Sequence, residues 1–351
     1  MRSVWLDALL RHVLAIPGVV VDLLDGRPSP PEFQDPDRVY GLVRAAARHP
    51  QAHLALEEGL HYHVDDEAII AYQVRRATAF AVGGLNVEPL RRAQTLRRFR
   101  DSLSQQGLRR HMLFPLRRDE LRSAFDAGFD ALQVGVEAWI DLQDFGLHGK
   151  AMAHLRQMRN RARRRGVQVG EVAVDDHKDS MALAYERWLE AKRPSWRMKL
   201  LVGSPGLDRP FDRRFFVATD DSGLQAFCTV VPGAPGEWGV DVMCRQPDAV
   251  PGSMERLLLC VIETLKEEGA TALSLGPCPM AGVPLRGKGL PLRYVFHLLY
   301  SSWLGNQVFG FRSLYRFKGK FRPRWEPVYF AASPRLGPVE LYQGCRMWGL
   351  Y

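Results

Sequence analysis

The sequence predicts an α/β protein in which a basic helix joins two similar units. In each half of the chain, segments that alternate apolar and polar residues, as strands do, are interspersed with segments of helical periodicity. The order of these segments recurs in the second half, although no fixed-period identity relates the halves. An arginine-rich segment of helical spacing lies between them. We therefore expect an N-terminal helical segment over 1–50, a first unit over 51–145, a linking helix over 146–168 and a second unit over 169–351.

The composition is that of a soluble globular protein. The 351 residues are 46% hydrophobic and 25% charged, enough for two domains that each bury a core. Lys and Arg number 48 against 39 Asp and Glu, which gives a net charge of +9. Five scattered cysteines without a CxxC pair indicate a reduced, cytoplasmic protein and argue against a zinc site. We expect no metal, no cofactor and no membrane span, so membrane contact would be peripheral.

The first unit is expected to contain a meander of antiparallel strands. Asp35 followed by Pro36 is a strong helix start, and Asp65 with Asp66 marks a turn between two strands. The expected elements are, in order, helices up to residue 24 and over 36–48, strands within 59–80, a helix over 87–106, a strand over 109–116, a helix over 119–127 and a strand over 131–142.

The second unit repeats this order after the basic segment. We expect a strand over 167–174, a helix over 178–192, three strands within 213–244, a helix over 251–268 and a strand over 271–276. The turns between the three strands are indicated by DDSG and GAPG.

The basic segment between the units reads GKAMAHLRQMRNRARRRG over 149–166. Helical spacing puts Ala151, Leu155, Met158 and Ala162 on one apolar stripe, with basic residues on both flanks. No Asp or Glu occurs between residues 145 and 170, so the arginines have no acidic partner one turn away. This favours a helix that faces anions such as a polyphosphate backbone or lipid headgroups. The alternative is a solvated amphipathic helix.

A second candidate site lies at the end of a strand in the second unit. Asp241 ends this strand, Arg245 follows it, and the loop QPDAVPG opens a helix with Glu255 near its start. Free N–H groups at a helix start can hold an anion or a developing oxyanion. Alternatively, Asp241 caps a turn and Glu255 complements the helix dipole.

The C-terminal stretch FGFRSLYRFKGKFRPRWEPVYF alternates cations with aromatic residues. This pattern suits the binding of phosphates and stacked bases. Alternatively, the aromatic residues form core and the cations extend into water. The sequence has no HExxH, no Walker loop and no GxGxxG.

These stretches, together with FFVATDDSGLQAFCTVVP, DVMCRQPDAVPGSMERL and ALSLGPCPMAG, resemble the soluble catalytic part of the aminoacyl-phosphatidylglycerol synthases, the multiple peptide resistance factor family. The resemblance runs from about His53 to about Ala332, and the KxKFxPxWEPxY ending is its most specific motif. It implies an α/β (α+β) fold of tandem GNAT-like acyltransferase domains joined by a basic helix. It further implies an aminoacyltransferase that moves an aminoacyl group from aminoacyl-tRNA to a hydroxyl of phosphatidylglycerol.

The resemblance also implies site residues and partners. By position, the central-helix motif comprises Arg156, Asn160 and Arg161, to which we add Arg159 from the helix pattern. The remaining motif positions are Asp241, Gly252, Glu255, Lys318, Lys320, Trp325 and Glu326, beside Arg245. The expected partners are aminoacyl-tRNA, phosphatidylglycerol or an anionic membrane surface, and a separate flippase, because the family's flippase region is not in this sequence. The expected location is the cytoplasm, peripheral to the inner face of the cell membrane.

From these residues we expect four to be catalytic. Asp241 or Glu255 would orient or deprotonate the acceptor or bind the aminoacyl ammonium, and Lys318 and Lys320 would neutralise a phosphate.

The sequence departs from the family pattern at three positions. Cys244 and then Arg245 stand where two arginines are usual, Pro251 where Asn is common, and Val328 where Arg is common. Aminoacyl transfer to a soluble acceptor is therefore an alternative. Less favoured are an acyl-CoA-dependent acyltransferase, because Gln246 is followed by PDAVPG rather than a pyrophosphate loop, and a non-enzymatic RNA- or membrane-binding module.

Overall fold

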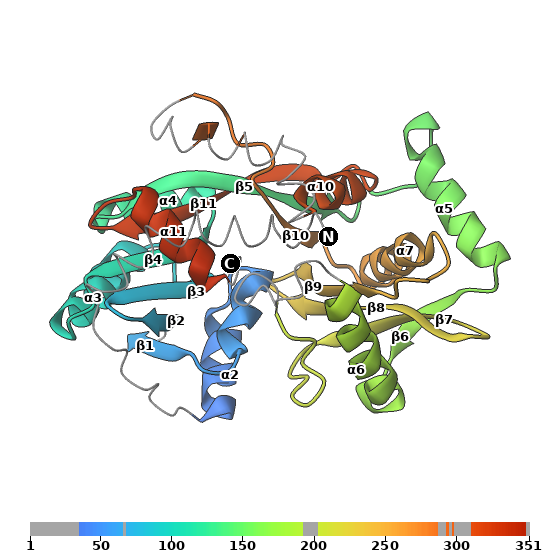
Figure 1. Ribbon diagram of the computed structural model, residues 1–351, viewed down its shortest axis with the longest axis horizontal. Coiled ribbons are helices and arrows are strands. Elements are labelled where there is room, and N and C mark those ends of the chain that lie inside the picture. The colour runs from blue at the N-terminus through green and yellow to red at the C-terminus, as the bar shows by residue number, and fades with distance from the viewer. Residues whose placement is uncertain are drawn as a thin grey trace, which may run out of the picture.

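One mixed sheet runs through the molecule and has helices on its faces (Figure 1). The computed structural model describes residues 35–65, 68–191, 203–286, 293–294, 297 and 310–348, so the helix expected before residue 24 lies outside the described residues. Within these ranges the sheet has 11 strands in the order β1-β2-β3-β4-β11-β5-β10-β9-β8-β7-β6. The predicted α/β class is confirmed.

The strands and helices have the following bounds. The strands are β1 (His61–Asp65), β2 (Ala68–Arg75), β3 (Thr78–Asn86), β4 (Arg110–Leu116), β5 (Asp130–Asp141), β6 (Gln168–Val172), β7 (Arg214–Asp220), β8 (Gly223–Pro232), β9 (Glu237–Arg245), β10 (Ala272–Pro279) and β11 (Arg324–Ser333). The helices are α2 (Pro36–Ala46), α3 (Arg92–Gln105), α4 (Leu121–Asp126), α5 (Ala153–Arg164), α6 (Val174–Ala191), α7 (Ser253–Glu267), α10 (Phe311–Gly319) and α11 (Pro338–Met347), with 3₁₀ helices η1 (Pro50–Leu56), η2 (Arg118–Glu120) and η3 (Lys150–Met152).

The order of elements in the first half recurs in the second. β1, β2 and β3 pair antiparallel, and α3 then leads to β4, which pairs parallel to β3. Likewise β7, β8 and β9 pair antiparallel, and α7 leads to β10, which pairs parallel to β9. The domain boundaries at 145 and 168 stay a prediction, because both halves contribute to one sheet.

The last strand of each half pairs with the other half. β5 ends the first half but pairs antiparallel with β10 of the second half. β11 ends the second half but pairs antiparallel with β4 of the first half, and β5 and β11 pair with each other. The two halves therefore exchange strands at the centre of the sheet.

Some element bounds differ from the sequence prediction for local reasons. α6 begins at Val174, four residues before the predicted start, and places Asp175 and Asp176 in its first turn, where carboxylates complement the helix dipole. The φ of Gly252 is 98°, outside the right-handed helical region, so α7 begins at Ser253.

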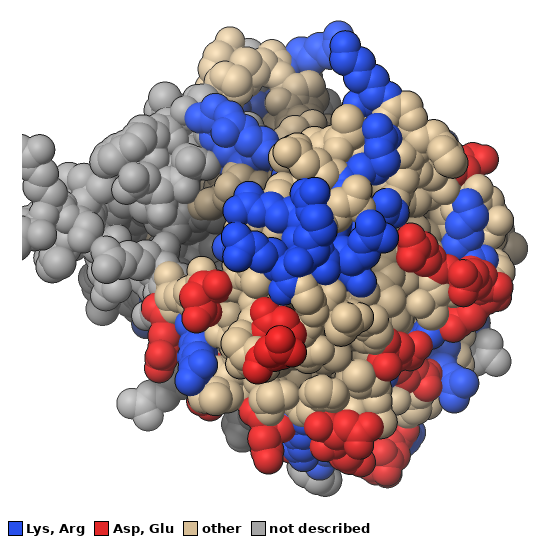
Figure 2. All heavy atoms as spheres, turned by 90° about the vertical axis from the view of Figure 1, so that its right-hand side faces the viewer, with Lys and Arg blue, Asp and Glu red and all other residues tan. Residues whose placement is uncertain are grey.

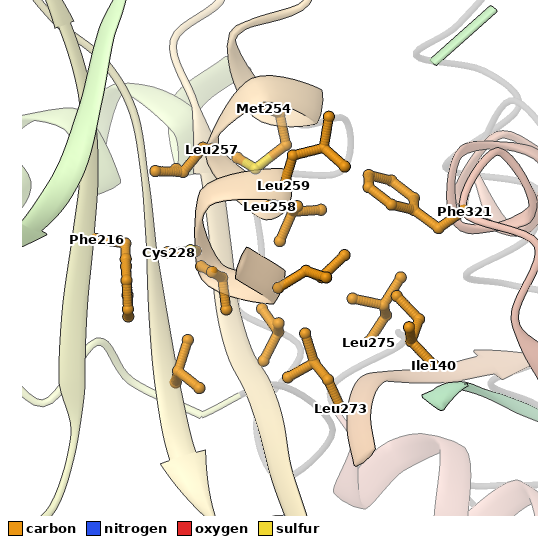
Figure 3. Close-up of a cluster of buried hydrophobic side chains, with 14 of the residues drawn as sticks. Ile140, Phe216, Cys228, Met254, Leu257, Leu258, Leu259, Leu273, Leu275 and Phe321 are labelled. Atoms are coloured by element: carbon orange, nitrogen blue, oxygen red, sulfur yellow. The ribbon is translucent and has the colours of Figure 1, made fainter. Parts of the chain in front are cut away.

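A buried cluster under α7 positions the elements that form the candidate site. Apolar residues at helical spacing give α7 one buried face against the sheet. Figure 3 shows Leu257, Leu258 and Leu259 between Phe216 and Cys228 on one side and Phe321 on the other. The same cluster contains Leu155 and Ala162 of α5, so α5, α7 and the turn at Phe321 share one core.

Within the described ranges, no helix is long and apolar enough to cross a bilayer.

Candidate functional site

The predicted basic helix is formed by η3 and α5, which lie beside α7 at one end of the molecule (Figure 1). Leu155 and Ala162 are fully buried and Met158 is half-buried, as the apolar stripe predicts. Ala151 is exposed and Met152 is buried in its place. The prediction was wrong at this position because residues 150–152 form a 3₁₀ helix, whose three-residue turn shifts the buried face.

The predicted arginines of α5 have different surroundings. Arg156 donates from Nη1 to the carbonyl oxygens of Leu147 and Gly149, at 2.6 and 2.7 Å, and so ties the helix to the segment before it. Arg159 donates from Nε to Oδ1 of Asn160 at 3.3 Å. Arg161 is exposed. Figure 2 shows Lys and Arg side chains gathered into one patch on this face of the molecule.

Arg256 of α7 adds a cation that the sequence analysis missed. Burial, and then the positive charges of Arg163 and Arg159, lower the pKa of its guanidinium. Its Nε is buried and has no hydrogen-bond partner in the described part of the chain. Arg159, Arg163 and Arg256 therefore form an arginine cluster between α5 and α7. Because like charges repel, an anion bound here would stabilise the cluster.

The start of α7 is held against α5. A Cβ atom on Gly252 would overlap with the backbone carbonyl of Met158, so only glycine fits. One turn into the helix, Oε1 of Glu255 lies 2.7 Å from Nζ of Lys320. This Nζ also lies 5.3 Å from the ring centre of Phe317. Glu255 and Lys320, two of the predicted catalytic residues, are thus an ion pair.

Beside this pair, a cavity of about 400 Å³ separates the basic helix from the C-terminal motif. Its lining residues are Ala151, His154, Leu155, Gly319, Lys320, Arg322, Pro323 and Trp325, none of them acidic. Trp325 stacks on Tyr315 with ring centroids 4.3 Å apart. The cavity therefore brings together the two stretches that sequence patterns singled out as anion-binding, and offers cations and an aromatic wall.

Arg322 lines the cavity in a strained backbone conformation. Its φ of 52° is left-handed, which costs a non-glycine residue about 1–3 kcal/mol. The turn is fixed by Phe321, which is fully buried, and by the bond from Arg322 N to the carbonyl of Gly319 at 3.1 Å. The core thus imposes the strain that directs this cation outward.

Lys318 lies apart from the cavity. Its Nζ donates to the carbonyl oxygens of Gly276 and Pro277, at 2.9 and 3.1 Å, where β10 departs from regular pairing. The residue is 2% exposed, and burial lowers the pKa of its ammonium. The structure therefore gives Lys318 a position that stabilises an irregular strand. Glu326 is likewise outside the cavity lining and pairs with Arg324.

Asp241 belongs to a separate buried cluster. Arg213 donates from Nη2 and Nε to Oδ2 of Asp241, at 3.2 and 3.3 Å, and its Nη2 lies 4.0 Å from Oε1 of Glu57. Ser204 donates to Glu57 from its backbone N at 2.7 Å and from Oγ at 3.0 Å. Burial raises the pKa of both carboxyl groups. Two carboxylates thus surround one guanidinium, and Asp241 lies where β9 has separated from β10 beyond Gly239.

The residues after Asp241 point in different directions. Cys244 is fully buried, and its Sγ donates to the carbonyl of Ala184 at 3.4 Å. Arg245 is exposed at the end of β9. The guanidinium beside Asp241 therefore comes from Arg213, on the neighbouring part of the sheet, and a local sequence pattern could not have indicated this pairing.

A third polar cluster lies in the core of the sheet. Nδ1 of His49 accepts a bond from Gln51 N at 3.0 Å, so its Nε2 bears the proton and donates to Glu137 at 3.0 Å. Ser274 donates from Oγ to the other oxygen of Glu137 at 2.5 Å. Burial alone would raise the pKa of Glu137, but these contacts hold it below its usual value. This cluster ties the start of η1 to β5 and β10. Among the described residues, no group of three His, Cys, Asp or Glu side chains could hold a metal ion.

Comparison with known proteins identifies the family. The model for the family "Phosphatidylglycerol lysyltransferase, C-terminal" matches residues 41–332. The chain belongs to this family. Similar relatives are a phosphatidylglycerol lysyltransferase from Bacillus subtilis, 23% identical over 86% of this chain, and the lysylphosphatidylglycerol biosynthesis bifunctional protein LysX from Nocardia farcinica, 29% identical over 60% of it. The chain spans 35% and 19% of these two proteins.

Several solved structures share the fold of this chain. The structure of L-PGS from Bacillus licheniformis matches with a TM-score of 0.74 over 92% of this chain and 99% of that one, at 21% identity. A C-terminal domain (DUF2156) from Agrobacterium fabrum matches with a TM-score of 0.73 over 90% of this chain and 97% of that one, also at 21% identity. The structure of FemX is more distant, with a TM-score of 0.53 at 10% identity.

Proposed function

We propose that this chain transfers an aminoacyl group from aminoacyl-tRNA to a hydroxyl group of phosphatidylglycerol. The observation with the most weight is the Glu255–Lys320 pair beside a cavity that the basic helix and the C-terminal motif enclose. Membership of the phosphatidylglycerol lysyltransferase C-terminal family and the names of the relatives support the lipid acceptor. The patch of Lys and Arg side chains on the α5 face, together with the arginine cluster between α5 and α7, supports a polyanionic donor.

The reaction exchanges one ester for another. The acceptor oxygen attacks the carbonyl carbon of the aminoacyl ester and a tetrahedral oxyanion forms. The bond to the ribose oxygen then breaks, and the proton lost by the acceptor hydroxyl ends on that ribose oxygen. Because the ester is already activated, the enzyme needs a proton carrier, a cation for the oxyanion and groups that hold both substrates.

The Glu255–Lys320 pair has the groups for the first two tasks. The Glu255 carboxylate, in the first turn of α7, takes the proton from the acceptor hydroxyl and returns it to the ribose oxygen. The Lys320 ammonium stabilises the oxyanion. Lys318 has a structural part in this proposal, because it ties the end of α10, two residues before Lys320, to β10.

The Asp241 cluster suits the ammonium group of the aminoacyl moiety. Two carboxylates, Asp241 and Glu57, share one guanidinium, that of Arg213, so the cluster has one negative charge to spare when both are ionised. An ammonium that replaces water there gains two charged acceptors.

Arg156, Arg159 and Arg161 of α5 would hold the tRNA backbone or anionic lipid at the surface.

An acyl-CoA donor is less favourable for a steric reason. The helix start that would bind a pyrophosphate in such an enzyme is that of α7. Here the backbone of α5 at Met158 lies directly against Gly252 and occupies this space. We further propose that the chain acts at the inner membrane surface as a peripheral enzyme beside a separate flippase.

The test is an incubation of the purified chain with a pool of radiolabelled aminoacyl-tRNAs and phosphatidylglycerol vesicles, followed by extraction into organic solvent. We expect label in the lipid phase, and its identity gives the amino acid. The Glu255→Gln chain is the control for the site. If label leaves the tRNA only when cell extract is present and never enters lipid, the acceptor is a soluble molecule and not phosphatidylglycerol. Binding of tRNA without loss of label under either condition would contradict the transferase proposal.

A further inference from the structure

The cavity between α5 and β11 is lined by two basic side chains that neither the proposed chemistry nor the arginine cluster uses. Arg322 and His154 both line it, one from the turn after α10 and the other from α5. Among the described residues, neither side chain makes a hydrogen bond or ion pair. Lys320, by contrast, is already paired with Glu255. The cavity therefore offers two side chains that can donate hydrogen bonds to an anion, next to the proposed reacting groups.

The aromatic wall of the cavity adds a second requirement for the ligand. Trp325 is held by Tyr315 on one ring face and packs with Val136 and Cys278, so its position is fixed by the core. Its indole also lines the cavity. A flat aromatic ring can stack on such a surface, whereas a glycerol headgroup has no π face. A volume of about 400 Å³ lies within the range of pockets that hold small ligands.

We propose that this cavity binds the terminal nucleotide of the RNA acceptor end, with its phosphate on Arg322 and His154 and its base against Trp325. The inference rests on the proposed function, to which it adds the binding site of the donor's reacting end. A nucleotide placed there has its ribose, and thus the aminoacyl ester, near the Glu255–Lys320 pair at the edge of the same cavity. In this proposal the strained turn has a function, because it directs the Arg322 guanidinium to the phosphate.

The test is calorimetric binding of the trinucleotide CCA, without any aminoacyl group, to the full chain. Arg322→Gln should weaken binding about tenfold, the effect of losing one charge-assisted bond of about 1.4 kcal/mol, and should reduce the slope of log affinity against log salt by about one. Trp325→Phe, which keeps a ring in the core, should weaken binding of CCA more than that of inorganic phosphate. Arg335→Gln, an exposed arginine beyond β11, is the matched control and should leave binding unchanged.

Four outcomes decide the proposal. Equal CCA affinity in the parent chain and the Arg322→Gln chain would overturn it. Competition by glycerol 1-phosphate, with loss of that competition in Arg322→Gln and no effect of Trp325→Phe on CCA, would assign the cavity to the lipid headgroup instead. CCA binding that depends on Arg322 and Trp325 supports the site even if no label reaches phosphatidylglycerol, so failure of the acceptor assignment is distinguishable. Conversely, transfer to lipid with an unchanged KM for aminoacyl-tRNA in Arg322→Gln would reject the site and leave the function standing.

Discussion

At the scale of single residues, the candidate site depends on pairs of side chains far apart in the sequence. Glu255 and Lys320 are 65 positions apart and form one ion pair. Asp241 receives its guanidinium from Arg213, although an arginine lies much nearer in sequence, at position 245. Sequence patterns indicated Glu255, Lys320 and Asp241 separately, because each stands at a recognisable helix start, motif or strand end. They could not indicate which side chains meet, since that is decided by the packing of α5, α7 and the turn after α10.

In the proposed mechanism, Glu255 has the most direct chemical role. Glu255→Gln keeps the side-chain shape and a hydrogen bond to Lys320 but cannot accept a proton. We expect kcat to fall by about 10²–10⁴-fold with KM for both substrates nearly unchanged. Steady-state transfer assays measure this, with Glu267→Gln at the exposed end of the same helix as the control. A higher KM with an unchanged kcat would show that Glu255 holds substrate and does not transfer a proton.

A buried histidine gives a pH dependence of stability. Burial, and then the charge of Arg213, lower the pKa of His53 from 6.5 to about 3. Between about pH 3 and pH 6.5, the unfolded chain therefore binds a proton at His53 that the folded chain does not bind. Stability from this residue is fully present above pH 6.5 and is lost as pH falls toward 3, at about 1.4 kcal/mol per pH unit.

Urea unfolding at pH 8 and pH 5 measures this effect. The parent chain should lose about 2 kcal/mol more than His53→Gln between the two conditions, because other titrating groups are common to both proteins. Equal losses in the two chains would mean that His53 is protonated in the folded state at pH 5.

At the scale of elements, the contact between α5 and α7 decides the shape of the site. α5 lines the cavity with His154 and Leu155 and covers the start of α7 with Met158. The sequence predicted both helices, the first from its apolar stripe. It did not predict that their ends touch, that the turn at residues 150–152 is a 3₁₀ helix, or that Lys318 points into the core. These features follow from close packing, which a one-dimensional pattern does not contain.

From this contact we predict different stability costs for alanine at two glycines. Gly252 and Gly166 both have positive φ, 98° and 81°, but only a Cβ on Gly252 would meet another atom, the carbonyl oxygen of Met158. Gly166→Ala should cost about 1–2 kcal/mol, the strain of a left-handed alanine. Gly252→Ala should cost that plus about 1–3 kcal/mol for displacing α5, and should also weaken CCA binding because the cavity wall moves. Chemical denaturation of both variants checks the difference, and equal costs would contradict the described contact.

At the scale of the whole molecule, the two halves interlock through β5 and β11. The α/β class and the repeated order of elements were predictable because alternation and helical periodicity are local signals. The exchange of strands was not, because β5 and β11 have the same pattern whichever edge they pair with. The two halves also meet beside η1: Glu57, just after it, lies near Arg213 of the second half, and His49, just before it, bonds to Glu137 on β5.

Strand exchange predicts the behaviour of a cut chain. A protease recognition sequence inserted after His148, in the exposed segment between β5 and α5, would allow cleavage into fragments that contain β5 and β11 separately. We expect the fragments to co-elute in size-exclusion chromatography and to separate only in denaturant, because each completes the other's sheet. Two native peaks after cleavage would contradict this, and the uncleaved insertion variant controls for the effect of the added residues.

The exchange of strands also sets an order for folding during synthesis. β4 ends at residue 116, and its neighbour β11 begins only at residue 324. While the chain is made, β4 is an open sheet edge until almost the entire sequence has left the ribosome. Open edges of this kind pair with other chains, and contacts so distant in sequence form slowly. A newly made first half is therefore the species most in need of a chaperone, and a truncated chain that stops before β11 would aggregate rather than accumulate as a folded domain.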